Sequence, residues 1–455
     1  MRFETINPVN NELVKRFAAH SWRQVQGMLK KSETGFDINR TSTLAIRSKR
    51  MKALAELLEN KKLFCAQLIT LEMGKPIKEA IAEIEKCART CHYFADNAKF
   101  FLADEVITTS YSSSMVSYMP LGAILAIMPW NFPFWQVFRF AVPAIMAGNV
   151  VILKHAPNVP QCALLIEDLF KQASFPEGIL QTLFLDHNKI KWVIEDPHIT
   201  AVTLTGSNAA GSKVAEIAGR SIKKTVLELG GSDPFIVLED ANVKEAAKVA
   251  VASRMVNCGQ SCIAAKRFIV METVFSDFVR EYVDNLLQLN MGDPTDITVD
   301  IGPMARQDLA DNLERQVKES MKMGAEALIG GGKPHAAEGA FFNPTLLVKV
   351  KPGMPVFDQE VFGPVASVIT AKTVNDAIEL ANKTKYGLGA SVWTTDTEKA
   401  LRLARQIQAG SVFINEMVVS HPSLPFGGIK QSGYGRELAQ AGIREFTNIK
   451  TMVVR

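Results

Sequence analysis

The chain changes from a strand pattern to a helix pattern at Leu204-Thr205-Gly206-Ser207-Asn208-Ala209-Ala210-Gly211. The apolar run Ala201 to Leu204 leads into this segment, and an amphipathic pattern from Ala209 to Ala218 follows it. Gly206 and Gly211 allow a ligand to approach the backbone, and the N–H groups at a helix N-terminus attract phosphate. The segment suits a dinucleotide pyrophosphate, but it is neither GxGxxG nor a Walker loop, and a plain strand-to-helix turn explains it at least as well.

Short apolar runs alternate with amphipathic helical patterns on both sides of this segment. In the first half, the predicted strands are Ala123 to Ile127, Val150 to Leu153, Leu180 to Leu185, Ala201 to Leu204 and Thr225 to Leu227. In a second series after Gly231, they are Phe235 to Leu238, Arg267 to Met271, Ala366 to Thr370 and Ala390 to Trp393. Repeated βαβ units imply a doubly wound parallel sheet, and the pattern occurs twice.

The remaining segments suggest how the chain divides. Helical spacing over Leu13 to Lys30, Ser42 to Leu58 and Lys78 to Leu102 predicts a helical cover, and the β-rich stretch Val106 to Tyr118 predicts a hairpin-like excursion for subunit contact. The 455 residues exceed what one core usually organises. We therefore predict a cofactor domain (residues 1–104 and 121–229), a second α/β catalytic domain (230–424) and a small β oligomerisation element (105–120 and 440–455).

Composition excludes several classes of partner. The chain is 47% hydrophobic with a formal charge of +4 and no dense basic tract, so neither nucleic acid nor an anionic membrane is expected. Prolines and Arg139 interrupt the apolar stretch from Met119 to Lys154, so no membrane span is expected. Six scattered cysteines without a secretory leader predict a reducing, cytoplasmic location. Cysteine and histidine spacing predicts no metal site.

Three segments carry residues with catalytic potential. Cys262 ends Gly259-Gln260-Ser261-Cys262 and offers a nucleophile, and Glu228, in Leu227-Glu228-Leu229-Gly230-Gly231, offers a general base. Alone, such a cysteine is usually a small buried hydrophobe and such a glutamate a solvated charge. In Met128-Pro129-Trp130-Asn131-Phe132-Pro133, two prolines fix the loop around Asn131, as a hydrogen-bond donor to a developing oxyanion requires.

These segments occur in a characteristic order with others. The ordered motifs are Pro129 to Pro133, Gly206 to Gly211, Leu227 to Gly231, Gly259 to Cys262, Glu360-Val361-Phe362-Gly363-Pro364, and Pro425 to Gly433. In this order the chain resembles the NAD(P)-dependent aldehyde dehydrogenases over essentially its whole length. The resemblance implies a homodimer or homotetramer that oxidises a small aldehyde with NAD or NADP.

The resemblance also implies roles for single residues. Cys262 would attack the aldehyde carbon, while the Asn131 amide and the Cys262 backbone N–H hold the oxyanion. Glu228 would activate the water that hydrolyses the thioester, and its presence favours hydrolysis because acyl-transferring members tend to lack it. The residues implied to bind the cofactor are Trp130, Lys154, Pro157, Gly206, Ser207, Gly211, Leu229, Glu360 and Phe362.

Arg139 indicates the substrate class. A guanidinium in an apolar helix would pair with a substrate carboxylate, whereas a structural role needs a carboxylate partner that the sequence does not identify. This placement resembles the short bacterial succinate-semialdehyde dehydrogenases. Ser420 and His421 stand where relatives contact the substrate, so either is expected to assist. A second arginine of some of these enzymes is Val256 here.

Several alternatives stay open at this point. Pro157 replaces the glutamate by which NAD-preferring relatives repel a 2′-phosphate, so both cofactors are expected to bind. Cys258 is expected to be a packed thiol, with a reversible Cys258–Cys262 disulfide as the sharper hypothesis. The substrate could instead be another small carboxylated or aliphatic aldehyde. A non-catalytic structural relative is disfavoured because Cys262, Glu228 and Asn131 are all present.

Overall fold

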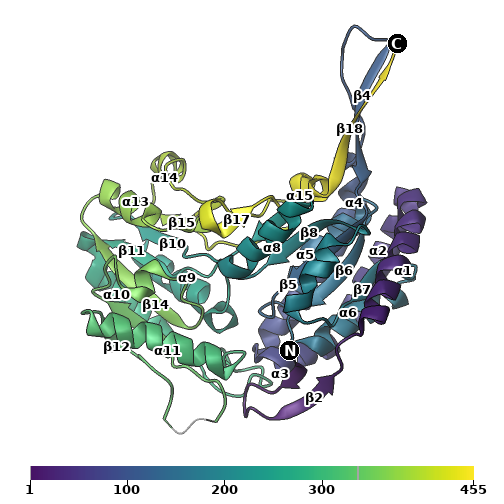
Figure 1. Ribbon diagram of the computed structural model, residues 1–455. Helices are drawn as coiled ribbons and strands as arrows, with labels where there is room; N and C mark the ends of the chain where they lie inside the picture. The colour runs from purple at the N-terminus through teal and green to yellow at the C-terminus, as the bar shows by residue number, and fades with distance from the viewer. Residues whose placement is uncertain (1, 336–337) are drawn as a thin grey trace.

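The computed structural model describes residues 2–335 and 338–455 and contains two α/β halves with a projecting β arm (Figure 1). The first half is built on a six-stranded sheet. In spatial order its strands are β17 (Gly433–Tyr434), β9 (Lys224–Glu228), β8 (Ile199–Thr205), β5 (Ala123–Met128), β6 (Val150–His155) and β7 (Leu180–Thr182). Strand β5 pairs in parallel with both β6 and β8, so the chain winds outward in both directions. This arrangement confirms the predicted doubly wound parallel sheet, to which β17 adds an antiparallel strand at the β9 edge.

Helices cover this sheet and bury its apolar side chains. They are α1 (Trp22–Thr41), α2 (Leu44–Asn60), α3 (Lys62–Met73), α4 (Ile77–Phe101), α5 (Trp135–Met146), α6 (Pro160–Gln172), α7 (Ile190–Glu195) and α8 (Asn208–Arg220). Helix α4 packs against α2, α3 and α5, and it joins the N-terminal cover to the loop before α5. The helical cover predicted for the first hundred residues is therefore present.

One predicted helix is wrong at its N-terminal end. Instead of a helix from Leu13 to Lys30, Leu13–Phe17 forms strand β2, which pairs antiparallel with β1 (Phe3–Ile6). Helix α1 begins only after Ser21, whose side chain accepts from the backbone N–H of Gln24 in a capping box. This cap sets the helix start, and the short run before it gains backbone hydrogen bonds from β1 instead.

The second half is built on a seven-stranded sheet. Its order is β12 (Glu326–Ile329), β13 (Thr345–Val348), β14 (Val365–Ala371), β11 (Arg267–Met271), β10 (Pro234–Val237), β15 (Gly389–Trp393) and β16 (Ser411–Ile414). Neighbouring strands are parallel except at the β12 edge. The helices here are α9 (Val243–Met255), α10 (Phe275–Leu286), α11 (Gln307–Lys322), α12 (Pro355–Asp358), α13 (Val374–Asn382) and α14 (Thr397–Ala404). The four strands predicted for this half are confirmed, while β12, β13 and β16 were not predicted.

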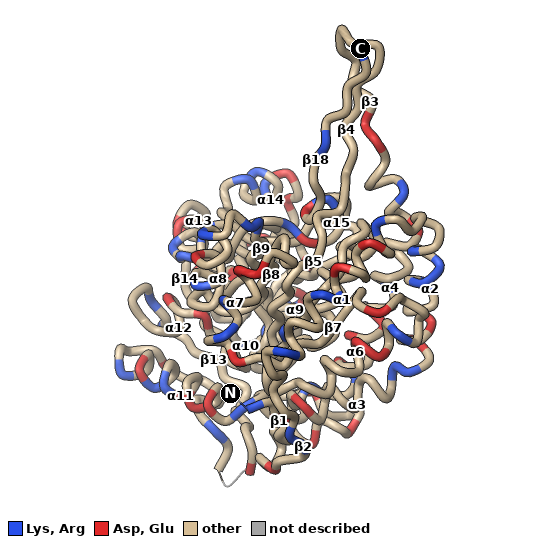
Figure 2. Tube along the Cα trace, turned by 45° about the vertical axis from the view of Figure 1, so that its right-hand side comes forward, with Lys and Arg blue, Asp and Glu red and all other residues tan. Residues whose placement is uncertain are grey.

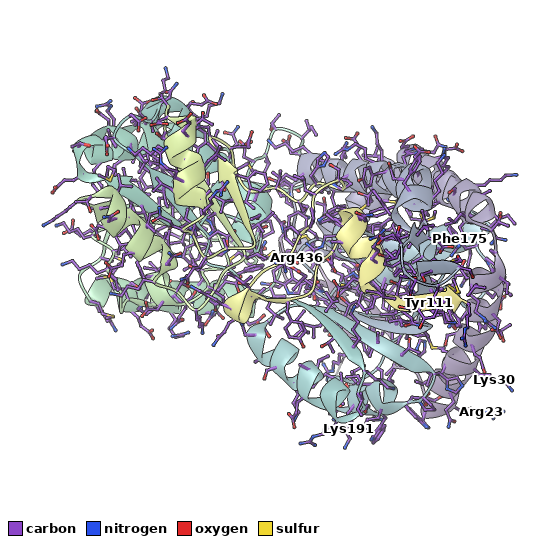
Figure 3. The ribbon with its side chains drawn as sticks, turned by 90° about the horizontal axis from the view of Figure 1, so that it is seen from above. Arg23, Lys30, Tyr111, Phe175, Lys191 and Arg436 are labelled. Atoms are coloured by element: carbon purple, nitrogen blue, oxygen red, sulfur yellow. The ribbon has the colours of Figure 1, made fainter. Side chains whose placement is uncertain are left out.

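A three-stranded arm projects from the body and carries the C-terminus at its tip (Figure 1). It contains β3 (Glu105–Val106), β4 (Ser113–Pro120) and β18 (Thr447–Val454). The predicted hairpin-like excursion is present, but the longer partner of β4 is β18, which follows α15 (Ala439–Glu445). On its way to the arm the chain crosses between the two halves near Arg436, as Figure 3 shows from above.

The charge distribution agrees with the small net charge. Lys and Arg alternate with Asp and Glu along the trace in Figure 2, without a large region of one sign. Among residues 2–335 and 338–455, no helix is both long and apolar enough to cross a membrane.

Candidate active site

The loop that carries Cys262 has an unusual backbone. Asn257, Cys258 and Gly259 all have positive φ angles, of 52°, 55° and 73°. Such a conformation is costly for a residue with a side chain and persists only where the surroundings enforce it. A Cβ atom on Gly259 would overlap the backbone of Gly363, so the loop admits only glycine there. The backbone turn therefore fixes where Cys262 lies.

Two charged residues hold this loop, one from each half of the molecule. Lys266 Nζ donates to the carbonyl oxygens of Ser261 at 3.0 Å, Cys262 at 2.8 Å and Ala264 at 3.0 Å. The Asn257 backbone N–H donates to Glu79 Oε2 at 2.6 Å, and Glu79 belongs to α4. The nucleophile loop is thus tied to both halves of the molecule.

Helix α4 positions the start of α5 as well. Glu83 Oε1 accepts hydrogen bonds at 2.9 Å from the backbone N–H groups of Phe134 and Trp135. Its other oxygen pairs with Lys75, and both of these side chains are fully buried. A carboxylate at a helix N-terminus satisfies free N–H groups and complements the helix dipole. The loop before α5, which contains Asn131, is held rigidly by this contact.

Asn131 lies beside the nucleophile loop, as expected for an oxyanion donor. It is 4% exposed, and its Nδ2 donates to the Gln260 carbonyl at 3.0 Å. Asn257 Nδ2 donates in turn to the Asn131 carbonyl at 2.7 Å. Because an amide nitrogen carries two hydrogens, one N–H of Asn131 remains available for a reacting oxygen.

Glu228 ends strand β9 inside the protein. Its side chain is 2% exposed, and neither carboxylate oxygen has a hydrogen-bond partner in the described part of the chain. Burial raises the pKa of Glu228 well above its ordinary value; Arg139 acts against this shift and Glu437 adds to it. A carboxyl group with a raised pKa and free oxygens is suited to accept a proton from water.

Cys262 is half-buried and is a free thiol. Burial raises the pKa of Cys262 to about 12, while nearby Arg139 and Lys266 lower it. The resting residue is therefore a thiol, and it must lose its proton before it attacks a carbonyl carbon.

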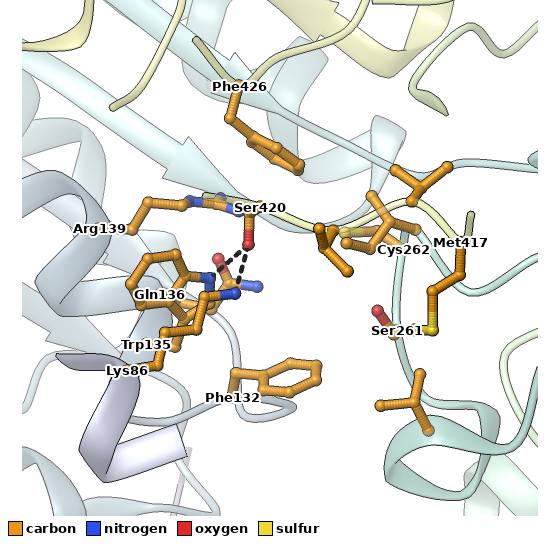
Figure 4. A pocket seen from close by; sticks show the side chains of 14 residues that line it. Lys86, Phe132, Trp135, Gln136, Arg139, Ser261, Cys262, Met417, Ser420 and Phe426 are labelled. Carbon is orange, nitrogen blue, oxygen red and sulfur yellow. Dashed lines mark hydrogen bonds between the residues drawn. The ribbon is translucent and has the colours of Figure 1, made fainter. Parts of the chain in front are cut away.

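A pocket opens onto Cys262, and Figure 4 shows it from close by. Its apolar wall includes Phe132, Val256, Ile263, Val418 and Phe426. Its polar and charged lining residues are Lys86, Gln136, Arg139, Ser261 and Ser420. Two cations in a largely apolar pocket favour a small substrate that has an anionic end.

The residues predicted to bind the substrate do not all lie in the pocket. Arg139 and Ser420 line the pocket, whereas His421 does not; it is exposed and its Nδ1 contacts Ser423 Oγ at 2.6 Å. The expectation that His421 assists is therefore not supported by its position. Arg254, the arginine nearest in sequence to Val256, does not replace the missing second arginine, because its guanidinium donates to the carbonyl oxygens of Ala265 and Gly259.

Arg139 has the structural partner that the sequence did not reveal. Its Nε forms an ion pair with Glu437 Oε2, and both side chains are 2% exposed. Its guanidinium carbon also lies 4.4 Å from the centre of the Phe426 ring. Glu437 follows the last motif of the chain, so sequence distance concealed this pair.

The residues expected to bind the cofactor gather at one edge of the first sheet. Strands β5, β6 and β8 are parallel, and their carboxyl ends lead to Trp130, Lys154 and Gly206. Ligands of open α/β sheets bind at this edge. Ser207 is the N-cap of α8, and its Oγ accepts from the Ala210 backbone N–H at 3.3 Å. The residue therefore stabilises the helix start in addition to its expected contact with the cofactor.

Other expected cofactor residues surround the same edge. A Cβ atom at Gly211 would lie 2.6 Å from Leu229, and one at Gly230 would lie 2.5 Å from Glu360 Oε2. Glu360 Oε1 accepts from the Gly231 backbone N–H at 3.0 Å. The Phe362 and Trp130 rings meet edge to face at 5.8 Å. Burial lowers the pKa of Lys154 to about 8. These cradles and the buried cation fit a phosphate-bearing dinucleotide.

Cys258 faces away from this arrangement. Its Sγ is fully buried and lies 3.2 Å from the Gly302 nitrogen and 3.4 Å from the Gly302 oxygen. Cys258 and Cys262 are both free thiols, so the structure supports the packed-thiol interpretation. Among the residues that the structure describes, no group of three His, Cys, Asp or Glu side chains could hold a metal ion.

The sequence interpretation missed Lys86, Glu79 and Glu83. All three belong to α4, which otherwise buries residues such as Ile84 and Cys87. A signal was present, because Glu79, Glu83 and Lys86 recur at helical spacing on the side of the helix that packs inward.

The chain belongs to the aldehyde dehydrogenase family, whose model matches residues 1–452. It is 51% identical over 452 residues to a Synechocystis sp. protein named probable succinate-semialdehyde dehydrogenase (NADP⁺), with 99% of each chain covered. It is 48% identical over 456 residues to the succinate-semialdehyde dehydrogenase (NADP⁺) of Mycobacterium avium, covering 99% of this chain and 96% of the other. A crystal structure of succinic semialdehyde dehydrogenase from Streptococcus pyogenes with NADP⁺ is similar at a TM-score of 0.97 and 34% identity, with 99% of each chain covered. The predicted family and fold class are confirmed.

Proposed function

We propose that the protein oxidises succinate semialdehyde to succinate with NADP as its main cofactor and NAD as an accepted one. The observation that carries this proposal is the pocket next to Cys262, where Lys86 and Arg139 stand in an otherwise apolar wall. Its charge complements an aldehyde with a carboxylate at its far end. The names of the relatives from Synechocystis and Mycobacterium avium support the same substrate.

Each step of the reaction has a residue suited to it. The Cys262 thiol gives its proton to solvent water, its sulfur adds to the aldehyde carbon, and the oxygen that becomes negative as the carbonyl π bond breaks is held by the Asn131 amide. A nicotinamide cofactor, held by the residues at the carboxyl ends of β5, β6 and β8, would supply the acceptor for the hydride on this carbon. Glu228 then removes a proton from water, the water oxygen adds to the thioester carbon, and the Cys262 sulfur leaves as succinate is released. The unpartnered oxygens of buried Glu228 support this role.

The cofactor preference rests on the carboxyl end of β6. Lys154 is a buried cation at this end of the strand, and Pro157 supplies no acid that would repel a 2′-phosphate. A phosphate next to Lys154 forms a charge-assisted contact that a ribose hydroxyl cannot match. Replacing Lys154 with Met is expected to reduce the preference for NADP over NAD.

A second candidate function is oxidation of another small aldehyde. The apolar residues Phe132, Val256, Ile263, Val418 and Phe426 favour it, because they would also accept a neutral aliphatic chain. The two functions differ in how strongly a terminal carboxylate improves the substrate.

The arm and the cysteines support proposals about the number of subunits and the cellular location of the enzyme. Exposed apolar residues on β18, including Ile449 at 66% and Val454 at 56% exposure, support a homodimer or homotetramer formed through the arm. The six-, seven- and three-stranded sheets support a division into residues 1–104 with 121–229, 230–424, and 105–120 with 440–455, with β17 of the six-stranded sheet outside these ranges. The free cysteines support work in a reducing cytoplasm.

The test is a steady-state panel of aldehydes. Succinate semialdehyde, its neighbours with one carbon fewer or more, butanal and pentanal are each offered with NADP and with NAD. We expect the highest kcat/KM for succinate semialdehyde with NADP. Equal values for succinate semialdehyde and butanal would favour the second candidate instead.

A further inference from the structure

Two cationic side chains line the pocket, and they differ in whether they already form an ion pair. The Arg139 guanidinium already has a carboxylate partner in Glu437. Lys86, on α4, forms no ion pair within residues 2–335 and 338–455; its Nζ donates to Ser420 Oγ at 2.7 Å. An ammonium group has three N–H donors, so two of them remain for a ligand.

Trp135 and Ser420 complete a small polar cluster with Lys86. Trp135 Nε1 donates to Ser420 Oγ at 3.1 Å, and Lys86 Nζ lies 4.1 Å from the centre of the Trp135 ring. Because Ser420 Oγ accepts both bonds, its own hydroxyl hydrogen is free to donate; no acceptor for it is found among the described residues. Figure 4 shows these three side chains together, across the pocket from Cys262.

We infer that Lys86, with Ser420, binds the terminal carboxylate of the substrate, beside Arg139, whose Nε is engaged by Glu437. This inference rests on the proposed function. One carboxylate oxygen accepts from Lys86 Nζ and the other from the Ser420 hydroxyl, while the aldehyde end reaches Cys262. Val256, where some relatives have a second arginine, lines the same pocket and offers no donor. Lys86 is therefore a cation that helps to set specificity for carboxylated aldehydes.

The test measures a ratio of kcat/KM values, for a carboxylated aldehyde over the neutral aldehyde of equal length. Succinate semialdehyde is compared with butanal, and 5-oxopentanoate with pentanal. Hydrogen bonds to a charged group contribute enough that Lys86→Met should lower the ratio by about 10- to 100-fold, mainly through KM. Lys86→Arg should retain most of the ratio, because it keeps the charge. Lys99→Met, an exposed lysine on the same helix, should leave the ratio unchanged.

A structural role for Lys86 predicts a different result. If Lys86 only packs against Trp135, Lys86→Met lowers kcat/KM for both aldehydes alike, and an unchanged ratio overturns the inference. Ser420→Ala is the second variant and should lower the ratio in the same direction. Inhibition by succinate gives a readout without turnover, and its inhibition constant should rise about 10- to 100-fold in Lys86→Met.

The outcome also separates this inference from the proposed function. If the wild-type enzyme prefers 5-oxopentanoate and Lys86→Met removes that preference, the choice of succinate semialdehyde is wrong and the role of Lys86 stands. If the wild-type enzyme prefers succinate semialdehyde and Lys86→Met keeps the preference, the function stands and the role of Lys86 is wrong. If no carboxylated aldehyde is preferred, both are wrong.

Discussion

Arg139 and Glu437 form a buried ion pair that connects α5 to the segment after the last motif of the chain, and each side chain is only 2% exposed. Taking two charges out of water is costly, and the pair compensates only while both partners are present. Burial raises the pKa of Glu437, and Arg139 opposes that shift. The pair also lies near Glu228, whose pKa responds to both residues.

Removing one partner of this pair should cost more than removing both. Arg139→Met leaves Glu437 as an unpaired buried carboxylate, so we expect a loss of about 3–5 kcal/mol in the free energy of unfolding. The double variant Arg139→Met with Glu437→Met should recover most of that loss. Denaturant unfolding of the two single variants and the double variant measures this, and strictly additive losses would contradict the account. It follows that kinetic defects of Arg139 variants alone do not prove substrate contact.

Gly433 is required for the strand that supports Glu228. It lies opposite Glu228 in the antiparallel pair of β17 and β9, with a φ of 111°, and a Cβ atom there would overlap the Leu227 carbonyl. Gly433→Ala should therefore lower stability by more than about 1 kcal/mol and reduce kcat. Gly219→Ala, in α8 with nothing within 4 Å of its new Cβ, is the matched control and should be neutral or stabilising. Thermal unfolding that shifts equally for both variants would argue against the strand contact.

The preference for a carboxylated substrate should depend on pH through Lys86. Burial lowers the pKa of Lys86 to about 8, Arg139 and Arg89 add to this shift, and Glu83 and Cys87 oppose it. A carboxylate binds the protonated ammonium, so the preference is complete below pH 8 and decreases above it. Above pH 8, the ratio of kcat/KM for succinate semialdehyde over butanal should fall by up to about tenfold per pH unit.

The ratio isolates Lys86, because Cys262 and Glu228 titrate identically for both aldehydes. In Lys86→Arg the ratio should stay constant across the same range, since a guanidinium remains charged. A wild-type ratio that also stays constant to about pH 10 would speak against carboxylate binding by Lys86.

Cys258 should have no part in redox control. Its Sγ is held against Gly302 and is fully buried, so a disulfide with Cys262 would require the strained loop to unfold. We expect wild-type enzyme and Cys258→Ser to lose activity in peroxide, and to recover it in thiol reductant, at the same rates. Slower recovery or irreversible loss in Cys258→Ser would restore the disulfide hypothesis.

Much of the fold was predictable because its signals are local. The strands around Gly206 are short apolar runs. Apolar periodicity predicts helices over Val243 to Met255 and Val374 to Asn382, and these are the bounds of α9 and α13, where N-caps agree with the pattern. Strand β2 was mistaken for helix because its pairing with β1 depends on tertiary contacts rather than on its own pattern. Strand β16 was not predicted because it is an edge strand whose four residues are all partly buried, so its sequence shows no alternation of apolar and polar residues.

The candidate site was predictable where the chemistry requires a motif. Cys262, Glu228 and Asn131 each stand in a distinctive string, and the structure brings the three segments together: Asn131 donates to Gln260, and a Cβ atom on Gly231 would lie 2.7 Å from the Cys262 carbonyl oxygen. Glu437 and Lys86 were not predictable in the same way, because their roles depend on contacts with residues about 300 positions away, Arg139 and Ser420 respectively. Helical spacing places Lys86 on the inward side of its helix, but a contact between residues so far apart leaves no trace of the partner's identity in a single sequence.

The acyl enzyme on Cys262 tests the central claim most directly. Glu228→Gln should still oxidise succinate semialdehyde with NADP once per active site but release succinate about 10²- to 10⁴-fold more slowly. Rapid mixing followed by intact-mass and peptide analysis should then find one succinyl group, attached to Cys262. Absence of any acyl adduct while NADP is reduced, or an adduct on a residue other than Cys262, would contradict the account.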